Sequence, residues 1–181
     1  MNKSKPQTEH KSVDLKKAVM VADRVELQNV RLVQTNCLLK PGGVKGPYEL
    51  SMDSNVTTKI NTENKNIAIV ASFELDAYVK DARKEAPDFK IGASFVLSYK
   101  IDNLEGLGEE HIQAFGESNG LYNAWPYWRE YVQNIVARMG LPSLTIPVFR
   151  LVPKEEKKES GGASKETKVL PVKKSRKKAQ K

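Results

Sequence analysis

Residues 67–79 read IAIVASFELDAYV, and the apolar side chains in this stretch fall on every second position. The other parity carries polar residues, among them Ser72, Glu74 and Asp76. A period of two is that of a β-strand with one face against a core and the other in water. The stretch therefore predicts a long, half-buried strand.

A second stretch, residues 89–101, repeats the pattern as FKIGASFVLSYKI. Its apolar face starts at Phe89 and ends at Ile101, whereas Lys90, Ser94 and Lys100 share the opposite face. Alternation of this length with one polar face is typical of antiparallel sheets. We therefore expect the two strands to belong to one antiparallel sheet.

Two weaker strands are expected before these. Residues 48–60 alternate less regularly and end at a turn sequence, Asn-Thr-Glu-Asn, at 61–64. Residues 25–39 contain a strand whose apolar residues change parity, which a bulge near Leu32 and Val33 would reconcile. Between them, residues 40–47 (KPGGVKGP) are too rich in Gly and Pro for a tight hairpin, and predict a mobile crossover loop.

After Gly106 the pattern becomes helical. Residues 109–115 predict a short helix with acidic residues at its N-terminus, which Asn119-Gly120 ends or bends. A second helix is expected to begin near Pro126, with apolar residues at steps of three and four, and to stop at Gly140 and Pro142. The predicted fold class is α+β, a four-stranded antiparallel sheet followed by two C-terminal helices.

The charge of +8 is concentrated at the two ends of the chain. Residues 154–181 hold eleven Lys and Arg against four Glu, and residues 1–17 hold five Lys against two acids. Neither end carries enough apolar surface to offset the entropy of ordering. The sequence therefore predicts a folded domain at 18–153 between a disordered N-terminus, 1–17, and a disordered basic tail, 154–181.

Cys37 is the only cysteine, so neither an intramolecular disulfide nor a cysteine pair for zinc is available. No run of about 18 apolar residues occurs, and no apolar stretch follows the N-terminal lysines. We expect a cytoplasmic protein without a membrane span.

Residues 124–132 (AWPYWREYV) lead to 138–142 (RMGLP), and this succession resembles the SecB family of protein-export chaperones. The order of elements matches over about residues 24–150, and the specific match lies at about 109–148. The resemblance implies a homotetramer, a dimer of dimers, whose apolar grooves hold extended segments of unfolded proteins. Clients would be secreted preproteins or one dedicated protein such as an antitoxin. SecB also docks on the SecA motor through acidic sheet residues and an apolar tail, and the basic tail here departs from that pattern.

The groove of the family maps onto the crossover loop and the long helix, which here are Leu38, Leu39, Pro41, Tyr48, Leu50, Trp125, Trp128, Val132 and Leu141. We assign the oligomer interface to Ile112, Phe115 and Tyr122. A second interpretation places both tryptophans in the core, where they anchor the helix to the sheet. Residues beside the loop are harder to bury, so the groove hypothesis depends more on the loop than on the helix.

No catalytic or metal-binding residue is predicted, and no cofactor. His111 and His10 have no second histidine or cysteine beside them, and Cys37 is expected to be a buried strand residue. Residues 42–46 lack the ending of a phosphate-binding loop. Arg129 and Glu130 are expected to make structural contacts. The sequence therefore does not indicate an enzyme.

The basic run comprises Lys173, Lys174, Arg176, Lys177 and Lys178. Such a run binds polyanions by counterion release, and a purely solubilising tail is an equally open interpretation. The function expected is an ATP-independent holdase. The alternative is a nucleic-acid or ribosome-associated protein that acts through this tail.

Overall fold

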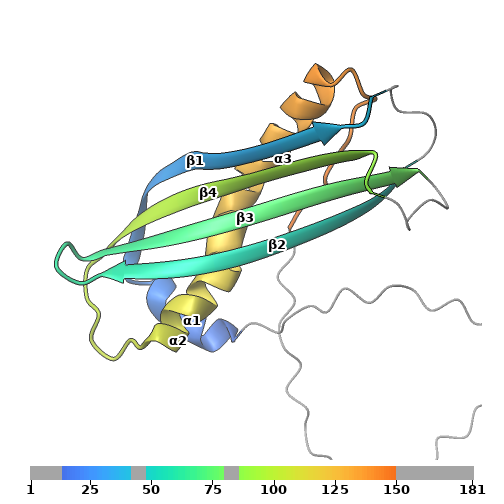
Figure 1. Ribbon diagram of the computed structural model, residues 1–181. Coiled ribbons are helices and arrows are strands. Elements are labelled where there is room, and N and C mark those ends of the chain that lie inside the picture. Colours follow the sequence, from blue (N-terminus) through green and yellow to red (C-terminus); the bar gives the residue numbers. More distant parts are fainter. Residues whose placement is uncertain (1–13, 42–47, 80–85, 150–181) are drawn as a thin grey trace, which may run out of the picture.

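The computed structural model describes residues 14–41, 48–79 and 86–149 (Figure 1). Its four strands, all antiparallel to their neighbours, are β1 (Val25–Leu39), β2 (Tyr48–Asn61), β3 (Asn66–Val79) and β4 (Phe89–Ile101). The sheet order is β1-β4-β3-β2, so β1 and β2 form its two edges. The predicted crossover therefore joins opposite edges, and residues 42–47 of it lie outside the described residues.

The helices form a second layer on one side of the sheet. They are α1 (Leu15–Ala22), α2 (Glu109–Phe115), the π-helical turn η1 (Gly116–Gly120) and α3 (Leu121–Arg138). In Figure 1, α3 crosses behind the sheet, and α1 and α2 lie together toward the end that carries the β2–β3 turn. The predicted fold class, an antiparallel sheet with two C-terminal helices, is confirmed.

The core lies between these two layers, and β3 and β4 contribute most of it. Their helix-side residues are almost completely buried: Ile67, Ile69, Ala71, Phe73, Leu75, Ala77, Phe89, Ile91, Ala93, Phe95, Leu97, Tyr99 and Ile101. Phe73 stacks on Trp128 with ring centroids 5.4 Å apart and meets Trp125 edge-on at 5.7 Å. Both tryptophans therefore join α3 to the sheet.

The start of the long helix differs from the prediction. The helix α3 begins at Leu121, and Pro126 lies inside it rather than at its first position. The chain stays helical from α2 through η1, because the turn packs closely on the sheet. A Cβ on Gly120 would lie 2.9 Å from Ile69 Cγ2, and one on Gly116 would lie 2.5 Å from Thr58 Cγ2. Only glycine allows this approach.

The helix α1 was not predicted, and it begins within the N-terminal segment, 1–17, that was expected to be disordered. Asp14 caps it, since its Oδ1 accepts hydrogen bonds from the backbone N–H groups of Lys16 (3.2 Å) and Lys17 (3.4 Å). Ala18 and Val21 are buried, and the helix packs against α2. The folded part therefore begins before the predicted boundary at residue 18. Residues 1–13 and 150–181 lie outside the described residues.

Strand β1 is bulged twice. Its register against β4 shifts between Leu27 and Asn29, and again between Leu32 and Gln34. The second shift confirms the bulge predicted near Leu32 and Val33, and the first was not predicted. Together they place Val25, Leu27, Val30, Leu32, Thr35, Cys37 and Leu39 opposite the helix-side residues of β4.

Candidate functional site

Exposed apolar side chains concentrate on the two edge strands. On β1, Leu27, Leu32, Val33 and Leu38 are between 40% and 54% exposed. On β2, Leu50 is 41% exposed and Ile60 is 37% exposed. An unpaired edge also presents free backbone N–H and C=O groups. These edges therefore combine apolar contact area with hydrogen-bonding capacity, which an extended peptide can use.

At the end where the crossover joins the sheet, one apolar row spans all four strands on the helix side. The register places Leu39 opposite Phe89, Phe89 opposite Ala77, and Ala77 opposite Leu50. Phe89 and Ala77 are buried in the middle, whereas Leu39 is half-buried and Leu50 is exposed. Tyr48 reaches across the row, and its ring meets that of Phe89 edge-on at 5.5 Å. We call Leu39, Tyr48 and Leu50 the crossover-end surface.

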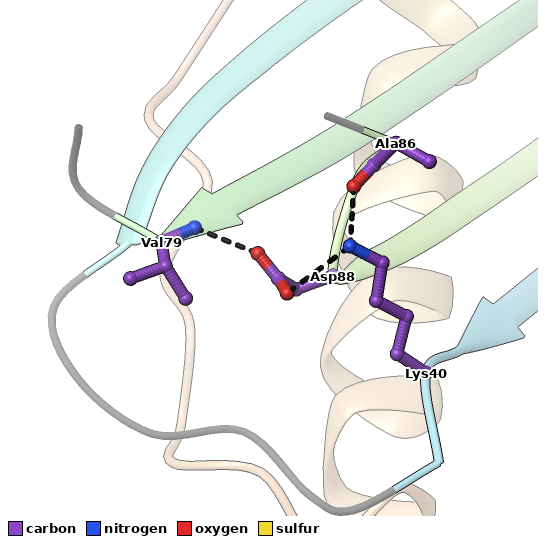
Figure 2. Close-up of polar contacts among 4 residues, drawn as sticks. All are labelled: Lys40, Val79, Ala86 and Asp88. Carbon is purple, nitrogen blue, oxygen red and sulfur yellow. Dashed lines mark hydrogen bonds and ion pairs between the residues drawn. The ribbon is translucent and has the colours of Figure 1, made fainter. Parts of the chain in front are cut away.

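A polar corner fixes the strand ends beside this surface (Figure 2). The Lys40 ammonium donates to the carbonyl oxygen of Ala86 at 2.6 Å and lies 3.5 Å from Asp88 Oδ1. Asp88 Oδ2 accepts a hydrogen bond from the backbone N–H of Val79 at 2.7 Å. Asp88 thus connects the ends of β1, β3 and β4. Burial, and then the negative charge of Asp88, raise the pKa of Tyr48.

A second apolar feature lies between β1 and α3. It is a groove of about 260 Å³ lined by Val30, Leu32, Phe95, Tyr127, Glu130, Tyr131 and Asn134. The Cys37 Sγ lies 3.3 Å from the Tyr131 hydroxyl oxygen, within hydrogen-bonding distance. Burial, and then this hydrogen bond, raise the pKa of Tyr131 to about 12. The groove follows the outer edge of the sheet, and we call it the β1–α3 groove.

Comparisons with known proteins agree with this architecture. No family model matches the sequence. The chain is 24% identical over 160 residues to a SecB-like chaperone of Mycobacterium tuberculosis strain CDC 1551 / Oshkosh. The aligned region covers 78% of this chain and 87% of that protein. The solved structure of the M. tuberculosis SecB-like chaperone Rv1957, in complex with a ChAD peptide from the HigA1 antitoxin, matches with a TM-score of 0.61 at 22% identity. That match covers 75% of this chain and 94% of the other.

The chain resembles SecB-like chaperones in sequence and shares their fold. The resemblance predicted from residues 124–142 is thereby confirmed, and so is the fold that it implied. The SecB-like sheet and long helix position both apolar features: the crossover-end surface lies at the end of the sheet where α3 ends, and the β1–α3 groove lies along its edge (Figure 1).

Three of the predicted groove residues lie in the core of this SecB-like fold. Trp125 is 6% exposed, and Trp128 and Val132 are fully buried. Their side chains cannot contact a bound chain in this conformation, so the prediction that they line the groove is wrong and the core interpretation is confirmed. The reason is that helix α3 directs them at Phe73 on the buried face of β3.

The remaining predicted groove residues are accessible. Leu38 is 52% exposed and lies opposite Lys90 on the face of the sheet that is turned away from the helices, which we call the open face. Pro41, which follows β1, is exposed, and Leu141 after α3 is half-buried. Leu39, Tyr48 and Leu50 form the crossover-end surface. The three therefore lie at one end of the helix side, Leu39 on one edge and Tyr48 and Leu50 on the other, whereas Leu38 lies on the other face.

Of the three residues predicted for the oligomer interface, two are buried and one is exposed. Ile112 and Phe115 are each 1% exposed, and the Phe115 ring meets that of Tyr99 at 5.1 Å. Both belong to the core of one chain, which corrects their assignment to an interface. Tyr122 is 56% exposed and is available to a second copy. The five basic tail residues at 173–178 lie outside the described residues.

The titratable residues have structural roles. The Nδ1 atom of His111 accepts a hydrogen bond from the backbone N–H of Gly108 at 3.0 Å, at the start of α2. The Lys90 ammonium lies 2.8 Å from Glu74 Oε2 and 3.9 Å from Asp76 Oδ1 on the open face. Its hydrogen bond to Glu74 raises the pKa of Lys90. These contacts stabilise the helix start and the sheet.

Within residues 14–41, 48–79 and 86–149, no group of three or more His, Cys, Asp and Glu side chains could hold a metal ion. No helix in these ranges is long and apolar enough to cross a membrane.

The sequence did not reveal the β1–α3 groove. Cys37 was expected to be buried in its strand, but it is exposed because β1 is an edge strand. The available signal was the pair Tyr127 and Tyr131, four residues apart on α3, which places both rings on one face of that helix.

Proposed function

We propose that the chain is an ATP-independent holdase that binds extended segments of non-native polypeptide at the crossover-end surface. The observation that carries the proposal is the apolar row from Leu39 to Leu50, whose outer members stay accessible at the sheet edges. The likeness to SecB-like chaperones supports the same activity. Shallow apolar contacts combined with backbone hydrogen bonds tolerate varied client sequences.

The client that we propose is a dedicated protein such as an antitoxin. The support is that Rv1957 was solved with a peptide from the HigA1 antitoxin. Engagement of SecA has weaker support, because Lys90 pairs with Glu74 and Asp76 on the open sheet face and reduces the negative charge there. Export of preproteins is therefore secondary in this proposal, and a cytoplasmic location follows only from the lone cysteine.

We further propose that copies of the chain associate, as a homotetramer would require. Strand β1 is 15 residues long, no described strand pairs with its outer side, and Leu27, Leu32 and Val33 are exposed along it. Tyr122 adds exposed aromatic surface next to the helix layer. Sedimentation equilibrium tests this: a tetramer is expected, and a monomer at all concentrations would contradict it.

The holdase is tested by diluting a chemically unfolded model protein and following light scattering. Full-length chain is expected to suppress scattering at a stoichiometric excess of a few fold, without ATP. A variant with Lys173, Lys174, Arg176, Lys177 and Lys178 changed to Ser is expected to suppress it equally. No suppression of the model protein, and none of an antitoxin-type client, would contradict holding.

The alternative, a nucleic-acid or ribosome-associated protein, has no support in the comparisons. The scattering experiment separates the two, because under the alternative neither the full-length chain nor the tail variant is expected to suppress aggregation.

A further inference from the structure

We propose that residues 169–172 of this chain, Val-Leu-Pro-Val, dock on the helix side of β2 at Tyr48, Leu50 and Met52, and compete there with client chains. We call these three residues the β2 stripe. The inference deepens the proposed function, since it names a regulator of the same surface, and it rests on that function for its competition step.

The structure shows how an aliphatic residue followed by Pro-Val is held on this side of the sheet. Residues 141–149 have no helix or strand, yet Ile146 is only 3% exposed. The indole Nε1 of Trp125 donates a hydrogen bond to the carbonyl oxygen of Pro147 at 2.9 Å. The ring of Phe149 packs on that of Trp125 at 5.1 Å. Helix α3 thus holds an irregular apolar segment of the same chain on the helix side of the sheet.

The same short pattern recurs near the C-terminus. Ile146-Pro147-Val148 is an aliphatic residue followed by Pro-Val, and so is Leu170-Pro171-Val172. Within residues 154–181, only Val169, Leu170 and Val172 carry aliphatic side chains larger than alanine. This is therefore the one part of the basic tail with an apolar surface to bury.

The chain leaves the described residues where such docking is possible. Phe149 contacts Trp125, Trp125 contacts Phe73, and Phe73 lies opposite Ser54 of β2. In Figure 1, the segment after α3 runs behind the sheet toward β2. The 20 residues after Phe149, up to Val169, span up to about 65 Å when extended, which exceeds the length of a 14-residue strand. The tail is therefore long enough to reach the β2 stripe of its own chain.

The β2 stripe is accessible to a second segment. Leu50 is 41% exposed, and Tyr48 and Met52 are half-buried. The carboxylates of Asp53 and Glu74 lie opposite one another on the other face of the sheet, so they do not border the stripe. The stripe therefore offers apolar contact area to the apolar part of the tail.

Tethering makes weak docking effective. A tethered segment meets its site at an effective concentration on the order of millimolar for short flexible linkers. A client must then displace the tail, so its apparent affinity falls in proportion to the docked fraction. The tail would keep the apolar surface covered until a client of sufficient affinity is present.

The test compares Leu170→Asp with Thr167→Asp, both in the full-length chain. Both variants add one negative charge to the same tail, but only the first changes the apolar segment. Hydrogen exchange of β2 amides 48–54 is measured without client, and the affinity for a fluorescent unfolded polypeptide is measured in parallel. Leu170→Asp is expected to speed exchange at these amides and to tighten client binding at least threefold, whereas Thr167→Asp changes neither.

Equal exchange in both variants would overturn the docking. Faster exchange with unchanged client affinity would overturn the competition. Absence of client binding by every form would contradict the proposed function instead, and the exchange data would still decide whether the tail docks.

Discussion

The centre and the edges of the sheet use the same alternation of side chains for different purposes. Phe73 on β3 and Phe95 on β4 are at most 4% exposed, whereas Leu50 on β2 and Leu32 on β1 occupy the same helix side and are more than 40% exposed. A central strand has a neighbour on both sides and helix α3 beneath it. An edge strand has one neighbour only, so its apolar residues are left for another chain. Stability should therefore reside in the centre and binding at the edges.

The largest effect is expected from Phe73→Ala. Phe73 is 1% exposed and contacts Trp125, Trp128 and Phe95, so its removal leaves a cavity in the core. The free energy of unfolding should fall by about 3–5 kcal/mol in urea denaturation. Leu38→Ala, at a 52% exposed edge position, should change it by no more than about 0.5 kcal/mol. Equal losses of unfolding free energy in the two variants would contradict the claim that stability resides in the centre of the sheet.

Gly120→Ala is expected to have the second-largest effect on stability. The added methyl would lie 2.9 Å from Ile69 Cγ2, so η1 would have to move away from the sheet. A loss of about 1–3 kcal/mol is expected from overpacking. Gly92→Ala is the control, because its methyl would come no nearer than 3.6 Å to an atom beyond its chain neighbours. A Gly120→Ala variant as stable as the control would show that η1 tolerates a methyl group at this contact with the sheet.

Alkaline pH probes the β1–α3 groove at the edge. The Tyr131 pKa is raised to about 12 in the folded chain, so the unfolded chain loses this proton first, near the ordinary value of 10.0. The contribution of Tyr131 to stability is therefore complete below pH 10 and is lost as the pH rises from 10 toward 12. Tyr131→Phe should lose less stability than wild type over this range.

Denaturant midpoints at pH 9, 10 and 11 measure this effect. Tyr122→Phe serves as the control, because Tyr122 is 56% exposed, and it should follow the wild type. Identical pH profiles for Tyr131→Phe and wild type would show that Tyr131 is not held in this environment.

The smallest effect concerns the open face. Glu74→Gln removes the contact with Lys90, but the Glu74 side chain is 56% exposed and the pair is screened by salt. The loss should be about 0.2–1 kcal/mol at low ionic strength and should vanish near 1 M salt. A larger loss that persists in salt would mean that the open face, too, stabilises the fold.

The alternation was sufficient to predict β3 and β4, because a half-buried strand requires apolar residues on one face and tolerates polar residues on the other, which gives a period of two in the sequence. The parity change near Leu32 likewise predicted one bulge. The start of α3 was missed, since a proline suits a first helical turn equally well and the packing of Gly120 on Ile69 is a tertiary contact. The helix α1 was missed because only Ala18 and Val21 of it are buried, too few to establish a period.

The site was harder to predict than the fold. Sequence alone could not separate Trp128, which is buried, from Leu50, which is exposed, because both are large apolar residues on elements that border the groove of the resembled family. Which strand is an edge decides this, and strand order depends on contacts far apart in the chain. Cys37 was expected to be buried for the same reason.

The most direct test of the central claim compares two substitutions on one strand. Leu50 and Ile60 both lie on the helix side of β2, 41% and 37% exposed, but only Leu50 belongs to the crossover-end surface. Binding of a fluorescent unfolded polypeptide is measured for Leu50→Asp and Ile60→Asp after denaturation shows both to be folded. Binding should weaken at least tenfold in Leu50→Asp and stay near wild type in Ile60→Asp. Equal binding by the two variants would contradict the account.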